Sequence, residues 1–351
     1  MALNASGPIS LGGATAGQSV AVELSLSATA QISLNDTVVR TLAGVASGAI
    51  ALNNFYGKSS AATTGVFYGG QLPGFAVTNL VTRLNACGTL IGSETTVSVA
   101  ILDPGAAPIG SNAVYYRNAQ GFCSNAVVRI NSSGALVGSV TNIGTGGQDV
   151  TGAKAGSIGV YHNYSFCSSG GCCTIISTRV RETTRINACG AQVGATTSIG
   201  TLRVNMAGAG IGSNAVFYGG IAGSTFYALT TRINACGTLV GAETTVGTAR
   251  GCFAGAPAGA IGIYYAGTTG ASRLNTVTRL NACATIVGVQ TAIGTARNGV
   301  AGASIGSNGV FHGGSTGSII NTVTRINVCG ALVGAQGSVG SAKNRGGGAG
   351  I

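Results

Sequence analysis

The chain contains no tryptophan and carries very little charge. Among its 351 residues there are 18 Lys and Arg and 7 Asp and Glu, while hydrophobic residues make up 45%. Intrinsic disorder requires the opposite balance and is excluded. Proline numbers only 5, and the 61 glycines follow no three-residue period, which excludes collagen. Polar or small residues interrupt every apolar stretch before the ~18 residues of a spanning helix, so we expect no membrane insertion.

The beginning of the chain is poor in basic residues. No Lys or Arg precedes Arg40, so the basic start of a secretory signal is missing. We therefore expect the protein to be made and folded in a cytoplasm, where thiols stay reduced. The ten cysteines are then expected to be small buried hydrophobes rather than a disulfide framework.

Six segments repeat one pattern. They are VTRLNACGTLIG (81–92), VVRINSSGALVG (127–138), TTRINACGAQVG (183–194), TTRINACGTLVG (230–241), VTRLNACATIVG (277–288) and VTRINVCGALVG (323–334). Each follows an aromatic marker such as GVFYGG or GVFHGG, and the better copies are followed by GTAR, at 247–250 and 294–297. The shared arginines form what we call the arginine column: Arg83, Arg129, Arg185, Arg232, Arg279 and Arg325.

Each repeat predicts four short strands. In the last copy we expect them at 301–306, 309–314, 321–327 and 331–343. Glycine and β-branched residues favour strands with tight turns, and helical periodicity is absent. A four-stranded unit of roughly 48 residues, repeated six times, is typical of a β-propeller. The sequence thus predicts an all-β, six-bladed propeller over residues 61–351, with blades at about 61–106, 107–152, 153–208, 209–256, 257–302 and 303–351.

The two ends of this region are complementary. The sequence from Gly65 opens at the second strand of a unit, whereas GGGAGI (346–351) looks like the first strand of a seventh. We expect this C-terminal strand to complete the first blade and close the ring, which removes exposed strand edges.

The repeat resembles the kelch repeat. An aromatic strand ending in Gly-Gly (complete at 69–70, 219–220 and 313–314) carries the resemblance, together with a basic residue after the fourth strand. The tryptophan that usually follows the hairpin in that family is replaced, for example by Leu90 and Gln192. The resemblance implies a kelch-like propeller.

Residues 1–60 match none of the repeat pattern. A strand is expected at 19–27 and a short helix within 33–46, capped by Ser33 or Asn35. A segment of this size is too small to bury a core of its own without help. We therefore expect it to be an anchor that packs on a partner.

The run ISLNDTVVRTLAGVASGAIALNNFYGKS resembles a segment near the start of tailed-bacteriophage structural proteins, notably cyanophage-like tail and fibre components. This resemblance implies a virion protein, made in the host cytoplasm and present in multiple copies. It would dock to other virion proteins through residues 1–60 and display the propeller, with host-surface polysaccharide as a second candidate partner.

Residues suited to catalysis are scarce. His162 and His312 share one repeat position, where they are expected to replace tyrosine, and the seven acids form no evident acid/base pair. We expect no catalytic residue, metal or cofactor, and hence no enzyme. A carbohydrate-active propeller enzyme (oxidase or glycan hydrolase) and a cellular kelch-like interaction scaffold are the alternatives.

Three further columns recur in the repeats. The arginine column is expected to bridge adjacent blades with its stems, the alternative being recognition of phosphate or carboxylate on host polysaccharide. A recurring asparagine is expected to bond the hairpin backbone. The column of Cys87, Cys189, Cys236, Cys283 and Cys329 is expected to be buried. Lys and Arg form no cluster interleaved with aromatics, so we expect no nucleic-acid partner.

Irregular loops follow the second strand of blades two and three. Loops carry function more often than regular elements do, so these are the expected recognition surface. A loop disulfide is the open alternative for their cysteines. The candidate residues are Phe122, Cys123, Tyr164, Phe166, Cys167, Cys172 and Cys173.

Overall fold

The chain divides into two compact units. The structure is a computed structural model that describes residues 3–4, 6–15, 17–24, 26–43, 45, 47–56, 63–118, 126–143, 148–165 and 180–351. The units are Met1–Ala62 and Thr63–Ile351, close to the expected limit after residue 60. Across the ranges that the structure describes, no helix is both long and apolar enough to cross a membrane.

The first unit is helical where it is regular. Its elements are α1 (Val20–Glu23), α2 (Thr37–Ala43) and the 3-10 helix η1 (Leu52–Phe55). The strand expected at 19–27 is wrong, because Ser19 caps a helical turn by accepting a 3.2 Å hydrogen bond from the Val22 amide. The helix expected within 33–46 is present but begins only at Thr37.

The first unit also buries a core, which corrects the expectation that it could not do so without help. Short helices and loops together enclose Leu3, Val20, Val39, Leu42, Ala43 and Phe55. Val20 and Phe55 are fully buried although they lie far apart in the sequence. Three short helices and the loops around them therefore suffice to shield a small cluster of side chains.

The second unit is built from six main antiparallel sheets. The first contains β25 (Gly347–Gly350), β1 (Thr64–Tyr68), β2 (Leu80–Asn85) and β3 (Thr95–Thr96). The second contains β4 (Leu102–Ile109), β5 (Asn112–Asn118), β6 (Ala126–Ile130) and β7 (Thr141–Asn142), and the third β8 (Gln148–Ala155), β9 (Ile158–Ser165) and β10 (Val180–Ile186).

The remaining sheets repeat this order. They are β11 (Ala207–Ile211), β12 (Asn214–Tyr218), β15 (Leu229–Asn234) and β16 (Thr244–Thr245); β17 (Ala254–Ala258), β18 (Ile261–Tyr265), β19 (Thr276–Leu280) and β20 (Thr291–Ala292); and β21 (Ala301–Ile305), β22 (Asn308–His312), β23 (Thr322–Ile326) and β24 (Gly337–Ser338). A small hairpin, β13 (Ile221–Ala222) and β14 (Thr225–Phe226), lies between β12 and β15.

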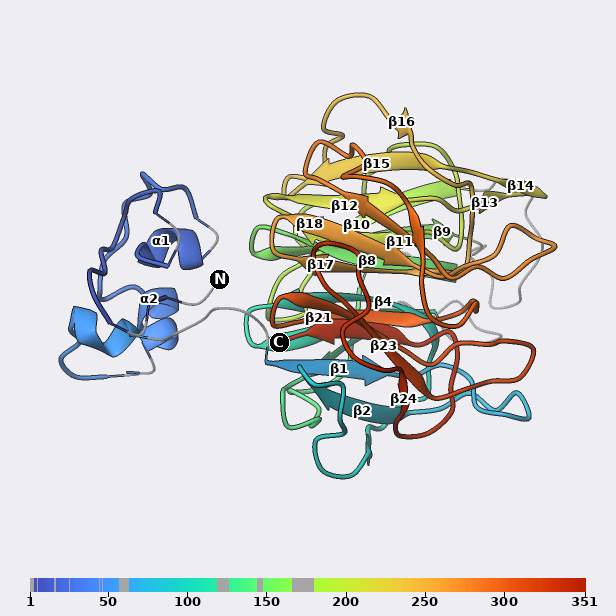
Figure 1. The fold of residues 1–351 in the computed structure, drawn as a ribbon, viewed down its shortest axis with the longest axis horizontal. Helices are drawn as coiled ribbons and strands as arrows, with labels where there is room; N and C mark the ends of the chain where they lie inside the picture. The colour runs from blue at the N-terminus through green and yellow to red at the C-terminus, as the bar shows by residue number, and fades with distance from the viewer. Residues whose placement is uncertain are drawn as a thin grey trace. The chain divides into compact units, whose positions relative to one another are not determined.

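The six sheets are the blades of a β-propeller, as the repeats predict. The first strands β25, β4, β8, β11, β17 and β21 contact one another in this order, and β21 returns to β25. Figure 1 shows β4, β8, β11, β17 and β21 gathered in the middle of the second unit. The expected blade limits fall inside β4, β8, β11, β17 and β21, because each of these strands belongs entirely to the later blade. The register of strand pairing, rather than the repeat boundary, defines the blade.

The ring is closed by the C-terminal strand, as predicted. β25 pairs antiparallel with β1, with Gly65 opposite Gly350 and Tyr68 opposite Gly347. The Ile351 amide donates to the Thr64 carbonyl at 2.8 Å. The first blade is thus assembled from both ends of the unit.

Glycines let the inner strands approach closely. A Cβ on Gly208, Gly255, Gly302 or Gly348 would lie 2.5–2.7 Å from the carbonyl oxygen of Gly152, Gly208, Gly255 or Gly302, respectively. Real Cβ atoms do not tolerate such contacts with backbone, so glycine is required by close approach and not by its φ angle. Contacts between the backbones of neighbouring first strands therefore set the distance between the blades at the axis.

Gly255→Ala is expected to lower the free energy of unfolding by about 2 kcal/mol, because the added methyl would force adjacent blades apart. Gly337→Ala is the matched control, since nothing lies within 4 Å of a Cβ at this strand glycine. Urea denaturation of both variants would check this, and equal stabilities would contradict the role given to the inner glycines.

Candidate functional site

The propeller has two distinct faces. A Cβ on Gly110, in the turn between β4 and β5, would lie 3.8 Å from Ala188 in the hairpin that follows β10. The turns after first strands and the hairpins after third strands therefore share one face, which we call the hairpin face. The loops after second strands adjoin the links between blades, as in the bridge between Gln71 and Asn344, on the opposite loop face.

Both ends of the propeller lie at the hairpin face. Thr64 pairs with Asn85, the residue at which the first hairpin begins. Ile351 accepts a hydrogen bond from the Thr64 amide at 3.0 Å. The chain therefore enters and leaves the propeller on the hairpin face, and the loop face points away from the attachment point.

The expected recognition loops cannot be placed. Phe122, Cys123, Phe166, Cys167, Cys172 and Cys173 lie outside the described residues. Tyr164 belongs to β9, where its backbone pairs with Arg181 of β10, but its side chain is also outside the description. The assignment of a recognition surface to these residues stays a prediction.

The arginine column lies between adjacent blades at the hairpin face. A Cβ on Gly134 would be 3.0 Å from Cδ of Arg83, and one on Gly190 would be 3.2 Å from Cδ of Arg129, so each stem packs on the hairpin of the next blade. Across the closure, Cδ of Arg325 would be 3.1 Å from a Cβ on Gly88. Five of the six blade junctions show this contact, and in each the glycine makes room for the arginine stem.

The guanidinium groups of the column have few protein partners. All six arginines are partly exposed. Arg279 donates from Nη1 to the Val328 carbonyl at 3.2 Å. Within the described ranges, the other five have no hydrogen-bond acceptor and no carboxylate partner, and Nε of Arg83 and Arg185 is buried without an acceptor. The terminal nitrogens of these partly exposed side chains are available to water or to an anionic ligand, whereas the buried Nε atoms are not.

The hairpins themselves are fixed by their asparagines. Oδ1 of Asn85 accepts hydrogen bonds from the amides of Cys87 at 2.9 Å and Thr89 at 3.0 Å, and Asn281 does the same in blade five. This turn directs the intervening side chain into solvent. The expectation of buried thiols is therefore wrong: the exposed cysteines are Cys87, Cys189, Cys236, Cys283 and Cys329.

A second basic column is buried, and sequence reasoning did not single it out. Its members are Arg203, Arg250, Arg297 and Lys343, each at most 3% exposed. The backbone of each of these residues follows the last strand of one blade, and its side chain extends into the next blade. Nη1 of Arg250, for example, donates to the carbonyls of Ala266 at 3.0 Å and Thr276 at 2.7 Å. The GTAR motif contains Arg250 and Arg297, and GTLR (200–203) and GSAK (340–343) are its equivalents for Arg203 and Lys343. Nothing in these motifs indicates that the basic side chain is buried.

Burial weakens the basicity of this buried basic column without removing its charge. It lowers the pKa of Arg203, Arg250 and Arg297 to about 10 and that of Lys343 to about 8. Arg250 also lies over the rings of Phe253 and Tyr218, with Cζ at 4.7 and 5.5 Å from their centroids. The carbonyls and ring faces replace the water that a buried guanidinium loses.

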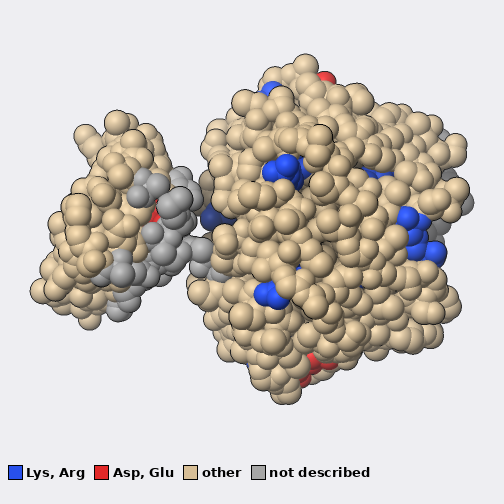
Figure 2. All heavy atoms as spheres, viewed as in Figure 1, with Lys and Arg blue, Asp and Glu red and all other residues tan. Residues whose placement is uncertain are grey.

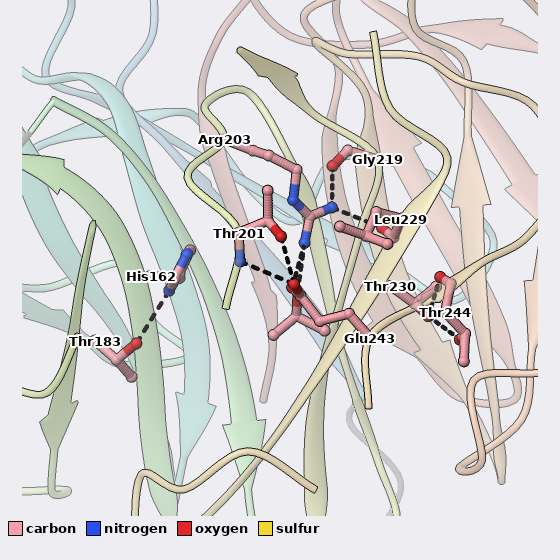
Figure 3. Close-up of polar contacts among 10 residues, drawn as sticks. His162, Thr183, Thr201, Arg203, Gly219, Leu229, Thr230, Glu243 and Thr244 are labelled. Carbon is pink, nitrogen blue, oxygen red and sulfur yellow. Dashed lines mark hydrogen bonds and ion pairs between the residues drawn. The ribbon is translucent and has the colours of Figure 1, made fainter. Parts of the chain in front are cut away.

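An acid or amide from the next blade completes each of these contacts. Between blades three and four, Oε2 of Glu243 accepts from the Thr201 amide at 2.9 Å, while Oε1 lies 3.3 Å from Nη2 of Arg203 (Figure 3). Gln290, Gln336 and Glu94 occupy the same place in the following junctions, with Thr248, Thr295 and Ser341 as their partners. We call this arrangement the basic inter-blade contact.

The junction between blades one and two replaces the basic inter-blade contact with apolar residues. Ile101 stands where the repeat has Arg250, and Val140 where it has Gln290. Ile101 is fully buried in a cluster against which Val140 packs. Both members of the pair change together, so neither a charge nor an amide is left without its partner.

A cluster of polar residues surrounds the axis at the loop face. Asp103, Asp149, Asn205, Cys252 and Arg345 each have φ between 50° and 56° at the start of a first strand. Nε of Arg345 donates to Oδ1 of Asp103 at 2.9 Å, and Nη2 reaches both Asp103 and Asp149. Burial raises the pKa of Asp103 to about 6 in spite of Arg345. We call these five residues the axial cluster.

The two histidines are buried in the column of second-strand tyrosines. Tyr265 donates its hydroxyl to the Ile293 carbonyl at 3.2 Å, and Nε2 of His312 lies 2.9 Å from the equivalent Val339 carbonyl. Nδ1 of His162 is instead 3.0 Å from Oγ1 of Thr183. Burial lowers the pKa of His312 to about 3, so this ring is neutral at physiological pH.

In the described part of the chain, no group of three or more His, Cys, Asp or Glu could hold a metal ion. Figure 2 shows charged side chains standing apart from one another on the visible surface. A comparison with models of known protein families finds no match, and a comparison with curated proteins finds no significant relative. What the structure shows is therefore the fold, a six-bladed β-propeller, and this fold is compatible with protein–protein interaction.

Arg203→Ile is expected to lower the free energy of unfolding by about 3 kcal/mol, because Glu243 loses its cationic partner and the carbonyls of Gly219 and Leu229 lose their donor. The double variant Arg203→Ile/Glu243→Val copies the natural apolar junction and should recover at least half of that loss. Glu243→Gln copies Gln290 and should change stability little. Urea denaturation in a double-mutant cycle would check this, and strictly additive losses would contradict it.

His312→Tyr is expected to remove part of the acid sensitivity of the protein. The unfolded chain takes up a proton near pH 6.5, whereas the folded ring stays neutral down to about pH 3. The free energy of unfolding therefore decreases as the pH is lowered from about 6.5 to 3, and His312 contributes up to about 1.4 kcal/mol of this decrease per pH unit. Unfolding free energies of both proteins between pH 7 and 4 should diverge, and parallel curves would refute the assignment.

Proposed function

We propose that the chain is a non-enzymatic structural protein of a tailed-phage virion, as part of a tail, fibre, baseplate or neck appendage. Residues 1–60 dock to another virion protein, and the propeller supports assembly and displays its loop face to the surroundings. Host-surface glycan is the second candidate partner. The observation that carries this proposal is the entry and exit of the chain on one face of the propeller.

The first unit has the properties expected of a docking module. It has its own buried core, and it nevertheless leaves Leu26, Leu52 and Tyr56 about 40% exposed. Exposed apolar residues of this size are common at protein interfaces. The resemblance of the run ISLNDTVVRTLAGVASGAIALNNFYGKS to phage tail components supports the same role.

The propeller supports display rather than catalysis. Glu94 and Glu243 are bound to side chains of adjacent blades, so they serve ring cohesion. The other acids of the propeller are Glu182, which has an interaction of its own, and Asp103 and Asp149 of the axial cluster. Arg345 binds both carboxylate oxygens of Asp103, which leaves this group poorly placed to protonate a leaving group.

Deletion of residues 1–60 is expected to leave a soluble propeller that no longer incorporates into particles, because the docking module is gone. Mass spectrometry of purified virions would measure incorporation. In the full chain, Leu26→Ser/Leu52→Ser/Tyr56→Ser should also reduce incorporation. Phe75→Ser/Val289→Ser, which changes exposed residues of the propeller, is the matched control. Normal incorporation of the truncated chain would overturn the proposal.

A further inference from the structure

We infer that the arginine column is a docking site for a carboxylate-rich polypeptide surface, supplied by the protein to which residues 1–60 attach. The inference rests on the proposed function and names the chemistry of its partner. Six guanidinium groups, one per blade, form a ring of positive charge at the hairpin face, where the chain enters the propeller.

Unsatisfied donors are the first observation that carries this inference. A guanidinium presents five N–H donors in a rigid fork. In the buried basic column, both terminal nitrogens of Arg250 are saturated by carbonyls and by Thr278. The terminal nitrogens of Arg83 and Arg185, by contrast, have no acceptor in the described structure, whereas Nε is buried without an acceptor in members of both columns. The same chain therefore satisfies one set of arginines and leaves the other open.

The charge balance is the second observation. The chain has a formal net charge of +11 and only seven acids. Glu94 and Glu243 bind adjacent blades, Asp103 and Asp149 face Arg345, Glu23 is buried in the first unit, Asp36 accepts from Ser33, and Glu182 is engaged elsewhere. Within the described propeller, no acid thus supplies a carboxylate to the arginine column, and we infer that a partner supplies it.

Apolar residues beside the column favour a polypeptide partner. Among the described residues of the propeller, five large hydrophobic side chains are exposed: Phe75, Leu239, Val289, Val328 and Leu332. Leu239, Val328 and Leu332 lie in the hairpins, and Val289 follows Gly288, beside which Nη2 of Arg279 lies. Arginine combined with apolar residues, and without competing acids, is the composition of protein interfaces.

Carboxylate is the anion that fits both the geometry and the attachment. The planar guanidinium fork binds a carboxylate through two parallel hydrogen bonds. Because Thr64 and Ile351 lie at the hairpin face, the linker to residues 1–60 starts there. The protein that these residues bind is thereby tethered near the column, which raises its effective concentration.

The experiment measures binding of the full-length protein to labelled poly-L-glutamate by fluorescence anisotropy at low and at physiological ionic strength. Arg83→Gln/Arg185→Gln is expected to weaken binding about tenfold, because two bidentate sites are lost. Arg83→Lys/Arg185→Lys keeps the positive charge and the aliphatic part of each side chain but loses the guanidinium fork. We therefore expect its affinity to lie between that of the glutamine variant and that of the unmodified protein. Arg273→Gln, an exposed arginine on the loop face, is the matched control and should bind normally.

Two further probes separate the partner classes. An oligothymidine and polygalacturonate carry phosphates and sugar carboxylates, respectively, and tighter binding of either than of poly-L-glutamate would overturn the polypeptide assignment. Unchanged binding by the glutamine variant would overturn the site. If that variant unfolds in thermal denaturation, the lysine variant decides, and full affinity there would also refute fork recognition. The two proposals can fail separately. If the arginine variants bind poly-L-glutamate normally while deletion of residues 1–60 still abolishes incorporation into virions, the docking site is refuted and the proposed function is retained.

Discussion

The close approach of backbone to backbone at the axis is the constraint on which the propeller depends. Gly208, Gly255 and Gly302 each lie against the carbonyl of a first-strand glycine in the preceding blade. Farther from the axis the side chains become larger, and in the second strands Tyr264 reaches the Val216 carbonyl of the preceding blade at 2.8 Å. This increase in size from glycine to aromatic gives each sheet the wedge shape that six blades need to close a ring.

Wedge packing also explains why the two basic columns behave differently. Near the ends of second and third strands, carbonyls such as Ala266 O and Thr276 O face an adjacent blade, and Arg250 satisfies them from inside the junction. At the hairpin face the blades diverge around small turns. The stem of Arg83 packs on Gly134 there, but its guanidinium finds no acceptor among the described residues. Arginine thus plays two roles in this fold. Buried arginines hold adjacent blades together, and partly exposed arginines at the hairpin face are available to bind a ligand.

The sequence predicted the parts of the fold that depend on the repeat. The spacing of Arg83 and its equivalents fixed the number of blades, and the first-strand pattern of 346–351 identified the closing strand. It failed where local pattern was ambiguous. The alternating residues of 19–27 formed a helical turn because Ser19 could cap it. The cysteine column was exposed because Asn85 and its equivalents turn the hairpin outward.

What the amino-acid order determined by itself was periodicity: six units, their strand order and the place of the missing strand. Periodicity follows from local alternation and turn residues, which are properties of neighbours in the chain. The tertiary structure alone decided which arginines are buried and satisfied, and which are partly exposed and open. Arg232 and Arg250 are the same residue type in the same repeat, but in the described structure only Arg250 finds acceptors, which an adjacent blade supplies. Such acceptors become neighbours only when the adjacent blade has folded against the arginine.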